Sequence, residues 1–561
     1  MRLHRFFTIF CLSAAVILLG GLLAPKLCLA QAYSANPKLV VVVVIDQFRG
    51  DYLERYRSDL KGRGFRLLLD EGAWFPDCYY NYANTKTAPG HATLGTGAYS
   101  DGHGIENNEW WDSARGYDHK VSSVEDERYA LVGVAAGSEP GASPRSLRAS
   151  TVGDELRLAT EGRSRVFGVS LKDRAAILPS GQAANGAFWM DAATGQFITS
   201  NYYMSQLPAW ALAFNASGRS AQAVAEAHSD GKGKFYSAVG GTPAANGYEL
   251  DFAKALISGE KLGQGPTTDM ITISLSANDI MGHAHGPDSD QERAMVLGLD
   301  RDLAGFFGWL DKTVGLGNVW IALSADHGVA PVPAQAAALG MNAATVDLAK
   351  LEVKLEAALK AKFPPSKTRF PQAPTAKYLL PGLDLPYITL DKRALEAAGI
   401  DETAAEDALA EALRTAVPEL VAAPVAGERL PPVPVVQATY TRLQMARGEL
   451  PPTEFGRLLA HSYADHDNWW VMLVLAGYQM QDVSGWGSPT GTTHFSPWSY
   501  DRHVPLAFYG APFQPGTYRG RVEPVDLAVT LASVLGINQP SAAVGRVLTE
   551  ALKPAATIIK P

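Results

Sequence analysis

The sequence is poor in cysteine, with three in 561 residues. Two of them, Cys11 and Cys28, lie in an N-terminal segment that we expect to be removed. The mature chain would then keep only Cys78 and could form no internal disulfide. Packing of the chain, rather than covalent cross-links, must therefore stabilise the fold.

The N-terminal segment, residues 1–30, has the pattern of a secretory signal. Arg2 and Arg5 precede an apolar run from Phe6 to Ala24, and small residues follow in Cys28-Leu29-Ala30. An uncleaved membrane anchor is the alternative, since the run is close to the lower limit of spanning length. In both cases we expect the rest of the chain to be periplasmic or secreted.

The sequence also lacks an excess of positive charge. Three of the 49 Lys and Arg lie in the signal, so the mature chain carries 46 of them against 57 Asp and Glu, a balance of −11. Binding along a nucleic-acid backbone usually needs a basic face, and we therefore expect no nucleic-acid partner. A local positive pocket for one anion is still compatible with this charge.

Three short apolar runs lead into acidic or imidazole side chains. Leu39–Ile45 ends at Asp46, Met270–Leu275 leads to Asp279, and Val319–Leu323 leads to Asp326-His327. A run that is apolar at every position is typical of a strand buried on both faces of a parallel sheet. Ligands bind beyond the carboxyl ends of such strands, so three acids at three strand ends predict one shared site.

Helical patterns such as Gln291–Leu310 separate these runs. This alternation predicts an α/β fold with a doubly wound, mostly parallel sheet and helices on both faces. Two stretches depart from it: residues 179–263 are rich in glycine, alanine and aromatics, and residues 332–483 mix helical patterns with proline-rich segments. We expect both to be insertions into one domain of residues 31–561, the second an α+β insertion over the ligand-binding end of the sheet.

Two pairs of polar residues have the spacing of metal ligands. Asp279 and His283, four residues apart, would share one face of a helix and form a workable pair of zinc ligands. Asp326 and His327 are adjacent and could bind one metal only if the chain turns there, which we expect Gly328 to make inexpensive. Each pair taken alone is also compatible with a purely structural role.

Two further candidates lie in polar segments. His494 ends Gly491-Thr492-Thr493-His494, before the strand-like Val504–Tyr509. We expect Thr87 at the N-cap of a helix with Pro89 in its first turn, so that free backbone N–H groups would face an anion. A metal lowers the pKa of a bound hydroxyl, and a threonine beside one would be a nucleophile. Without a metal, Thr87 would be an ordinary helix cap.

Taken together, these motifs resemble the alkaline phosphatase superfamily, and most closely its single-chain, phosphate-irrepressible bacterial phosphatases with a threonine nucleophile. The resemblance runs from about Leu39 to Gly510, with gaps in the insertions. Five motifs in family order are far more specific than any one of them. They are Asp46, Thr87-Ala-Pro-Gly-His91, Asp279-x-x-x-His283-x-x-x-Pro287, Asp326-His327-Gly328, and His494 before Asp501-x-His503-Val504-Pro505.

The resemblance implies two Zn²⁺ per chain and a set of phosphate contacts. One zinc would be held by Asp46, Asp326, His327 and the Thr87 oxygen, and the other by Asp279, His283 and His494. Phosphate would be contacted by Asn108, Lys172 and Arg174. The spacing leaves Asn107 open as the amide in place of Asn108, and a solvated Lys-x-Arg turn is the alternative for the last two.

The implied function is that of a secreted, zinc-dependent alkaline phosphatase that hydrolyses small phosphate monoesters through a phospho-threonine. Cationic donors such as Lys172 and Arg174 favour the two charges of a monoester over the single charge of a diester. One alternative is a phosphodiesterase or nucleotide pyrophosphatase of the same superfamily, with Trp110-Trp111 or Tyr202-Tyr203 stacking a base; another is a non-catalytic phosphate-binding protein. A sulfatase is not expected, because the Cys/Ser-x-Pro-x-Arg motif is missing. We expect a monomer that does not contact the membrane once its signal is removed.

Overall fold

The structure is a computed structural model that describes residues 36–135, 139–364, 377–420, 435–465, 469–483 and 491–554. The predicted secretory signal, residues 1–30, lies outside the described residues. Among the helices that are described, none has the length and apolar character needed to cross a membrane. The chain from Pro37 to Lys553 forms a single unit.

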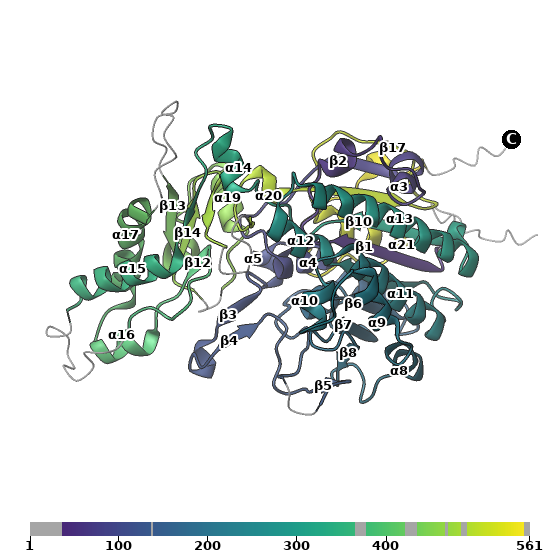
Figure 1. The fold of residues 1–561 in the computed structure, drawn as a ribbon, viewed down its shortest axis with the longest axis horizontal. Coiled ribbons are helices and arrows are strands. Elements are labelled where there is room, and N and C mark those ends of the chain that lie inside the picture. Colours follow the sequence, from purple (N-terminus) through teal and green to yellow (C-terminus); the bar gives the residue numbers. More distant parts are fainter. Residues whose placement is uncertain are drawn as a thin grey trace, which may run out of the picture. The chain divides into compact units, whose positions relative to one another are not determined.

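A ten-stranded sheet forms the centre of this unit (Figure 1). Its five middle strands are parallel, and the strands beside them, β16 (His503–Tyr509) and β8 (Phe197–Ser200), are antiparallel to their inner neighbours. This confirms the α/β class with a mostly parallel sheet. In spatial order the middle strands are β10 (Val319–Ser324), β1 (Leu39–Ile45), β9 (Asp269–Leu275), β6 (Val166–Ser170) and β7 (Gly186–Met190).

The register of β1 with its two neighbours makes three strands end together. Val44 pairs with Ser324 of β10 on one side and with Ser274 of β9 on the other. Directly beyond this level, the backbone N–H of Asp46 donates to the carbonyl of Leu275 at 3.1 Å. The segments that follow these three strands therefore leave the sheet at one common edge.

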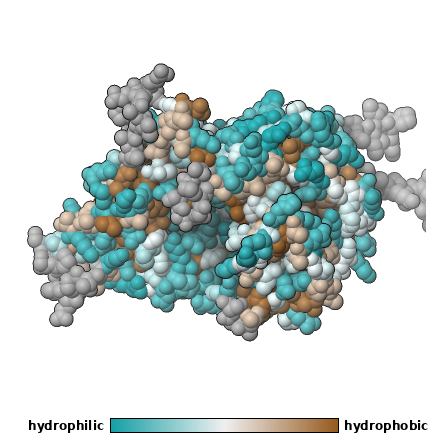
Figure 2. Space-filling view, in the orientation of Figure 1, coloured by the Kyte–Doolittle hydropathy of each residue, from teal (hydrophilic) through white to brown (hydrophobic). Residues whose placement is uncertain are grey.

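Helices cover both faces of the sheet, and every residue of β1 is therefore buried. One packed group consists of α3 (Phe65–Glu71), α11 (Pro243–Gly259), α12 (Ala277–His285) and α13 (Asp290–Thr313). A second group consists of α4 (Thr87–Thr96), α6 (Val152–Ala159), α7 (Asp173–Ile177) and α21 (Asp526–Leu535). The face drawn in Figure 2 is largely hydrophilic, with scattered hydrophobic patches, as expected where helices turn their apolar sides inward.

The described residues between 332 and 483 build a separate layer, drawn in green in Figure 1. Its antiparallel sheet has the order β12 (Tyr387–Ile388), β14 (Val471–Leu475), β13 (Val436–Thr441). Helices α15 (Leu348–Lys362), α16 (Lys392–Ala398) and α17 (Glu402–Leu420) pack with it. The core of this layer is built from leucines spaced four apart: Leu351, Leu355 and Leu359 of α15, and Leu409 and Leu413 of α17.

Residues 179–263 are organised differently. Here β7 and β8 join the central sheet, so this stretch widens it. The helices that follow are α8 (Ala209–Asn215), α9 (Arg219–Glu226), α10 (Phe235–Val239) and α11.

Gly168 in β6 lets the chain after the strand return close to it. A Cβ at Gly168 would lie 2.1 Å from the carbonyl oxygen of Ala176 and 2.2 Å from Oγ of Ser180. We expect Gly168→Ala to displace α7 and to lower the free energy of unfolding by about 1–3 kcal/mol, measured by denaturant unfolding. The control is Gly308→Ala in α13, whose added methyl group meets no atom within 4 Å and which should stabilise by up to about 1 kcal/mol. Equal effects of the two substitutions would contradict this packing.

Candidate active site

The common edge of β1, β9 and β10 gathers three carboxylates. Asp46 directly follows β1, Asp326 follows β10 after Ala325, and Asp279 lies in the first turn of α12, which follows β9. All three carboxylates are buried. The strand ends thus place three acidic side chains in one low-dielectric region.

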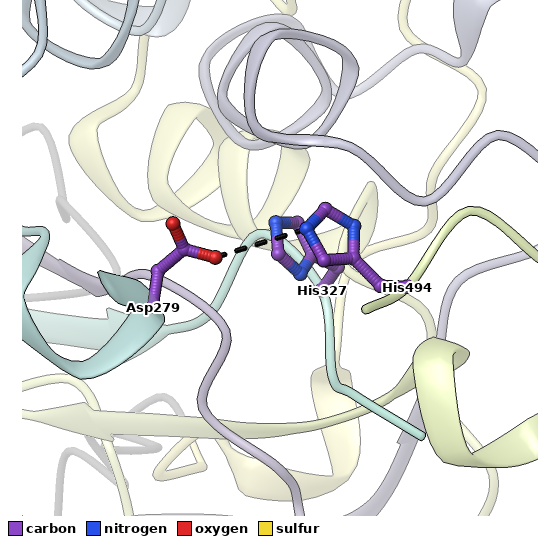
Figure 3. Close-up of side chains that lie close together, drawn as sticks. All are labelled: Asp279, His327 and His494. Carbon is purple, nitrogen blue, oxygen red and sulfur yellow. Dashed lines mark ion pairs between the residues drawn. The ribbon is translucent and has the colours of Figure 1, made fainter. Parts of the chain in front are cut away.

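Histidines divide these carboxylates into two groups. Ligand atoms of Asp46, Asp326 and His327 lie within 4.8 Å of one another, and so do those of Asp279, His327 and His494 (Figure 3). His327 Nε2 is 3.5 Å from Asp46 Oδ1 and 3.4 Å from Asp326 Oδ2, and His494 Nε2 is 3.7 Å from Asp279 Oδ1. The imidazoles of His327 and His494 are stacked, with ring centroids 3.7 Å apart.

His283 extends the second group. It lies one helical turn after Asp279 in α12, and its Nε2 is 3.2 Å from Asp279 Oδ1. Its ring centroid lies 5.1 Å from that of His494. The structure therefore brings together all six carboxylate and imidazole side chains that the sequence singled out.

The three imidazoles are oriented in the same way. Nδ1 of His283, His327 and His494 contacts a backbone carbonyl at 2.9, 3.0 and 2.5 Å, on Thr492, Gly328 and Thr85 respectively. A carbonyl only accepts hydrogen bonds, so each Nδ1 carries the proton. In the neutral form the lone pair is then on Nε2, the atom that faces the carboxylates, and this is the arrangement that second-layer hydrogen bonds give to metal-binding histidines.

Three of the atoms that face one another in these groups are buried without a hydrogen-bond partner among the described residues, as expected at a site that binds a cation. They are Asp46 Oδ1, Asp326 Oδ2 and His327 Nε2. Leaving such atoms unpaired is unfavourable, and a cation bound between them would satisfy all three. The nitrogen and oxygen donors of the two groups, with no thiolate, fit a catalytic zinc.

The electrostatics of the site are dominated by crowded negative charge. Burial and the nearby carboxylates of Asp279 and Asp326 raise the pKa of Asp46 well above its ordinary value. The Lys172 ammonium lies 2.6 Å from Asp46 Oδ2 and 2.7 Å from Asp279 Oδ2. Burial opposes the charge of Lys172, but Asp279 and Asp46 hold its pKa above the ordinary value. One ammonium therefore links the two groups.

Thr87 is the first residue of α4, and Lys86 occupies the N-cap. The predicted N-cap position of Thr87 is therefore wrong by one residue. The Lys86 side chain does not cap the helix, because an ammonium cannot accept a hydrogen bond from a backbone N–H; it pairs instead with Asp384 Oδ2 at 3.0 Å. Gly90 brings α4 against the end of β10, where a Cβ would lie 2.3 Å from the carbonyl oxygen of Asp326.

His91 connects Thr87 with the carboxylates. Its Nδ1 lies 2.8 Å from the Thr87 carbonyl and 3.3 Å from Asp326 Oδ2, and its Nε2 lies 2.7 Å from Ser274 Oγ. His91 was part of the threonine motif, but nothing in the sequence indicated these contacts.

The two asparagines have different surroundings. Asn108 Oδ1 accepts a hydrogen bond from the backbone N–H of Ala88, next to Thr87, at 2.8 Å. The Asn107 side chain instead accepts from the Asn108 N–H and donates to Asp384 at 3.3 Å. Asn108 is therefore the asparagine whose side chain reaches the start of α4.

Lys172 and Arg174 follow β6, but only Lys172 contacts the two groups. The closest charged partner of Arg174 among the described residues is Asp173, at 3.6 Å.

Gly328 differs from expectation, since it does not have the positive φ of a glycine turn. It is needed for close packing, because a Cβ there would lie 2.2 Å from the Tyr500 carbonyl oxygen.

Removing one of the crowded carboxylates should stabilise the metal-free protein. Its raised pKa makes ionised Asp46 unfavourable in the folded state, so this penalty is absent below about pH 4 and grows as the pH rises above it. We expect Asp46→Asn to raise the free energy of unfolding in excess chelator at pH 7 by at least about 1 kcal/mol, since one pKa unit corresponds to about 1.4 kcal/mol. Thermal unfolding between pH 4 and 8 measures the difference.

The control is Asp118→Asn at the exposed surface, which should change little. Added zinc should stabilise the wild type much more than Asp46→Asn. A destabilised metal-free Asp46→Asn, or equal stabilisation of both by zinc, would contradict the charge crowding described above.

Comparison with known proteins adds independent findings. A family model described as type I phosphodiesterase / nucleotide pyrophosphatase matches residues 40–423. The chain is 32% identical to alkaline phosphatase PhoV of Synechococcus elongatus, covering 92% of this chain and 94% of PhoV. It is 34% identical to alkaline phosphatase PafA of Elizabethkingia meningoseptica, covering 95% of this chain and 98% of PafA.

Crystal structures of PafA match the fold closely. The wild-type structure has a TM-score of 0.80 at 31% identity and covers 92% of this chain and 99% of PafA. A second PafA structure, with the same TM-score, carries a threonine-to-serine change and the replacement of an asparagine, a lysine and an arginine by alanine.

Proposed function

The chain belongs to the type I phosphodiesterase/nucleotide pyrophosphatase family of the alkaline phosphatase superfamily and is a phosphatase. We propose that it is a secreted, zinc-dependent phosphomonoesterase in which the substrate transfers its phosphoryl group to Thr87 during turnover. One observation carries the proposal. Three histidines with protonated Nδ1 atoms direct Nε2 toward three buried carboxylates, at the sheet edge where α4 begins with Thr87. Two zinc ions would fit this set of donors.

In the proposed arrangement the donors divide between two zinc ions. Asp46, Asp326, His327 and the Thr87 oxygen would hold one; Asp279, His283 and His494 would hold the other. When bound, zinc supplies a Lewis acid that lowers the pKa of the Thr87 hydroxyl and offsets charge on the ester oxygens.

The chain's own residues would then carry out a two-step transfer. The Thr87 hydroxyl gives its proton to solvent, and its Oγ1 forms a bond to phosphorus while the in-line bond to the leaving oxygen breaks. The leaving alkoxide takes up a proton from solvent and departs as the alcohol. Water then cleaves the phospho-threonine, which releases phosphate and restores the hydroxyl. The first turn of α4 offers few donors to the negative charge that Thr87 carries in between, because the Ala88 N–H is bonded to Asn108 Oδ1, the Gly90 N–H is bonded to the Lys86 carbonyl, and Pro89 has no N–H.

Three residues are proposed to bind the phosphoryl oxygens. The Asn108 side chain is fixed through its oxygen to Ala88, so its amide nitrogen can donate to the ester. Lys172 lies between the two groups, where a phosphate bridging them would meet its charge. The substituted PafA structure supports the assignment of Asn108 and Arg174. Its threonine and asparagine are 21 positions apart and its lysine and arginine two apart, as are Thr87 and Asn108, and Lys172 and Arg174.

A phosphodiesterase activity is the second candidate. The family model that matches the chain is named for diesterases, and a small pocket beside Asn107 is lined by Trp110, Trp111 and Tyr387. These aromatic rings could stack on the second organic group of a diester. Comparing kcat/KM for an aryl phosphate with that for a bis-aryl phosphate separates the two, because faster turnover of the diester would overturn the monoesterase proposal.

Removal of the proposed nucleophile should separate catalysis from metal binding. We expect Thr87→Ala to lower kcat/KM for an aryl phosphate by about a thousandfold or more, because no oxygen remains to accept the phosphoryl group. Elemental analysis should still find nearly two zinc ions per chain, since six carboxylate and imidazole donors remain. Thr87→Ser, which keeps a hydroxyl, is the matched control and should retain much of the activity. A fully active Thr87→Ala would refute the nucleophile.

Lys172 and Arg174 should favour a doubly charged monoester over a singly charged diester. We expect Lys172→Ala/Arg174→Ala to lower kcat/KM for the monoester by about a hundredfold or more, and for the diester by less than about tenfold. The exposed Arg163→Ala controls for a general loss of positive charge. Equal losses on the two substrates would show that the pair does not select for the monoester dianion.

A further inference from the structure

We propose that Gln47 is a positioning residue that fixes the two metal-binding groups relative to each other, an inference that rests on the proposed two-zinc site. Gln47 follows Asp46 and is fully buried. It contacts one carboxylate through its backbone and another through its side chain, and these two carboxylates belong to different groups.

The backbone contact is to Asp326. The N–H of Gln47 donates to Asp326 Oδ1 at 3.0 Å. The other oxygen, Oδ2, then faces His327 Nε2 at 3.4 Å. Because one carboxylate oxygen is held by the amide, the rotation of the Asp326 carboxylate is fixed with Oδ2 toward its histidine.

The side-chain contact is to Asp279. Nε2 of Gln47 donates to Asp279 Oδ1 at 2.7 Å, and an ionised carboxylate can only accept, so the amide orientation is defined. Oδ1 is also the oxygen nearest to His283 and His494, whereas Oδ2 contacts Lys172. The amide thus holds Asp279 with one oxygen toward the histidines and the other toward the ammonium.

The backbone of Gln47 shows that the surroundings impose this arrangement. Its φ is 62°, in the left-handed region of the backbone that residues other than glycine rarely adopt. The side chain of Asn278 donates to the carbonyls of Asp46 and Gln47, at 3.1 and 3.3 Å, and secures the turn. Gly282 leaves room for the amide, since a Cβ there would lie 1.9 Å from Gln47 Oε1.

Substitution of Gln47 by glycine removes the contact to Asp279 and keeps the contact to Asp326. Gln47→Gly keeps the backbone N–H that holds Asp326 and suits the positive φ, but it removes the amide that holds Asp279. We therefore expect a 10- to 100-fold loss of zinc affinity for one of the two equivalents only, the range seen when such second-layer partners are removed. The measurement is a titration of metal-free protein with zinc against a chelator of known affinity, with bound zinc counted by elemental analysis.

Two further variants test the assignment. Gln47→Ala also lacks the amide but keeps a Cβ at positive φ, so it should lose the same zinc affinity as Gln47→Gly while unfolding at a lower temperature in excess chelator. In a His494→Ala background, which already disrupts the Asp279 group, Gln47→Gly should cause no additional loss in affinity for the equivalent that remains.

The outcomes are distinguishable. Binding of both equivalents by Gln47→Gly with wild-type affinity would overturn the role of Gln47, and so would equal weakening of both equivalents. A wild-type protein that binds no zinc would instead refute the proposed function on which the inference rests.

Discussion

The structure depends on the confinement of three carboxylates at one edge of a parallel sheet. Because β1, β9 and β10 are paired in register, Asp46, Asp279 and Asp326 leave the sheet at the same level and are buried together. Buried like charges are strongly unfavourable unless cations compensate them. Lys172 is the one cationic side chain that bridges two of these acids among the described residues. Burial lowers the pKa of His327 and His494, so these two imidazoles are neutral and add no positive charge.

The segments around this edge hold the donors in place. Loop carbonyls of Thr85, Gly328 and Thr492 fix the three histidines, while Gln47 fixes two of the carboxylates. Thr85 belongs to the loop that leads into α4, so His494 and Thr87 are positioned by the same segment. Preorganisation of this kind lets charge that develops at a reacting phosphoryl group meet fixed dipoles and cations.

Much of the fold followed from the sequence, because its strands are buried on both faces and are therefore apolar throughout. The run Leu39–Ile45 coincides with β1, and Val319–Leu323 and Met270–Leu275 fall one residue short of β10 and β9. The pairing of β7 and β8 with the central sheet was not apparent, since residues 179–263 lack that clear pattern. Strand order depends on contacts between distant segments, which composition does not encode.

The candidate donors were also predictable, because acids and histidines directly after apolar strands are recognisable. The contacts that orient them were not. The partners of Gln47, His91 and Asp384 lie 183 or more residues away in the sequence, and no pattern of neighbouring residues marks these contacts. The roles expected for Gly328 and for the start of α4 were wrong in detail, because both depend on how closely another backbone approaches.

The central claim is that the two groups of carboxylates and imidazoles hold a pair of zinc ions beside Thr87. Anomalous diffraction at the zinc edge, from crystals of the protein grown with zinc and inorganic phosphate, tests it most directly. The account predicts two zinc peaks about 4 Å apart, one within bonding distance of Nε2 of His494 and one within bonding distance of Asp46, with Oγ of Thr87 at the latter. A single peak, or zinc bound away from these side chains, would contradict it.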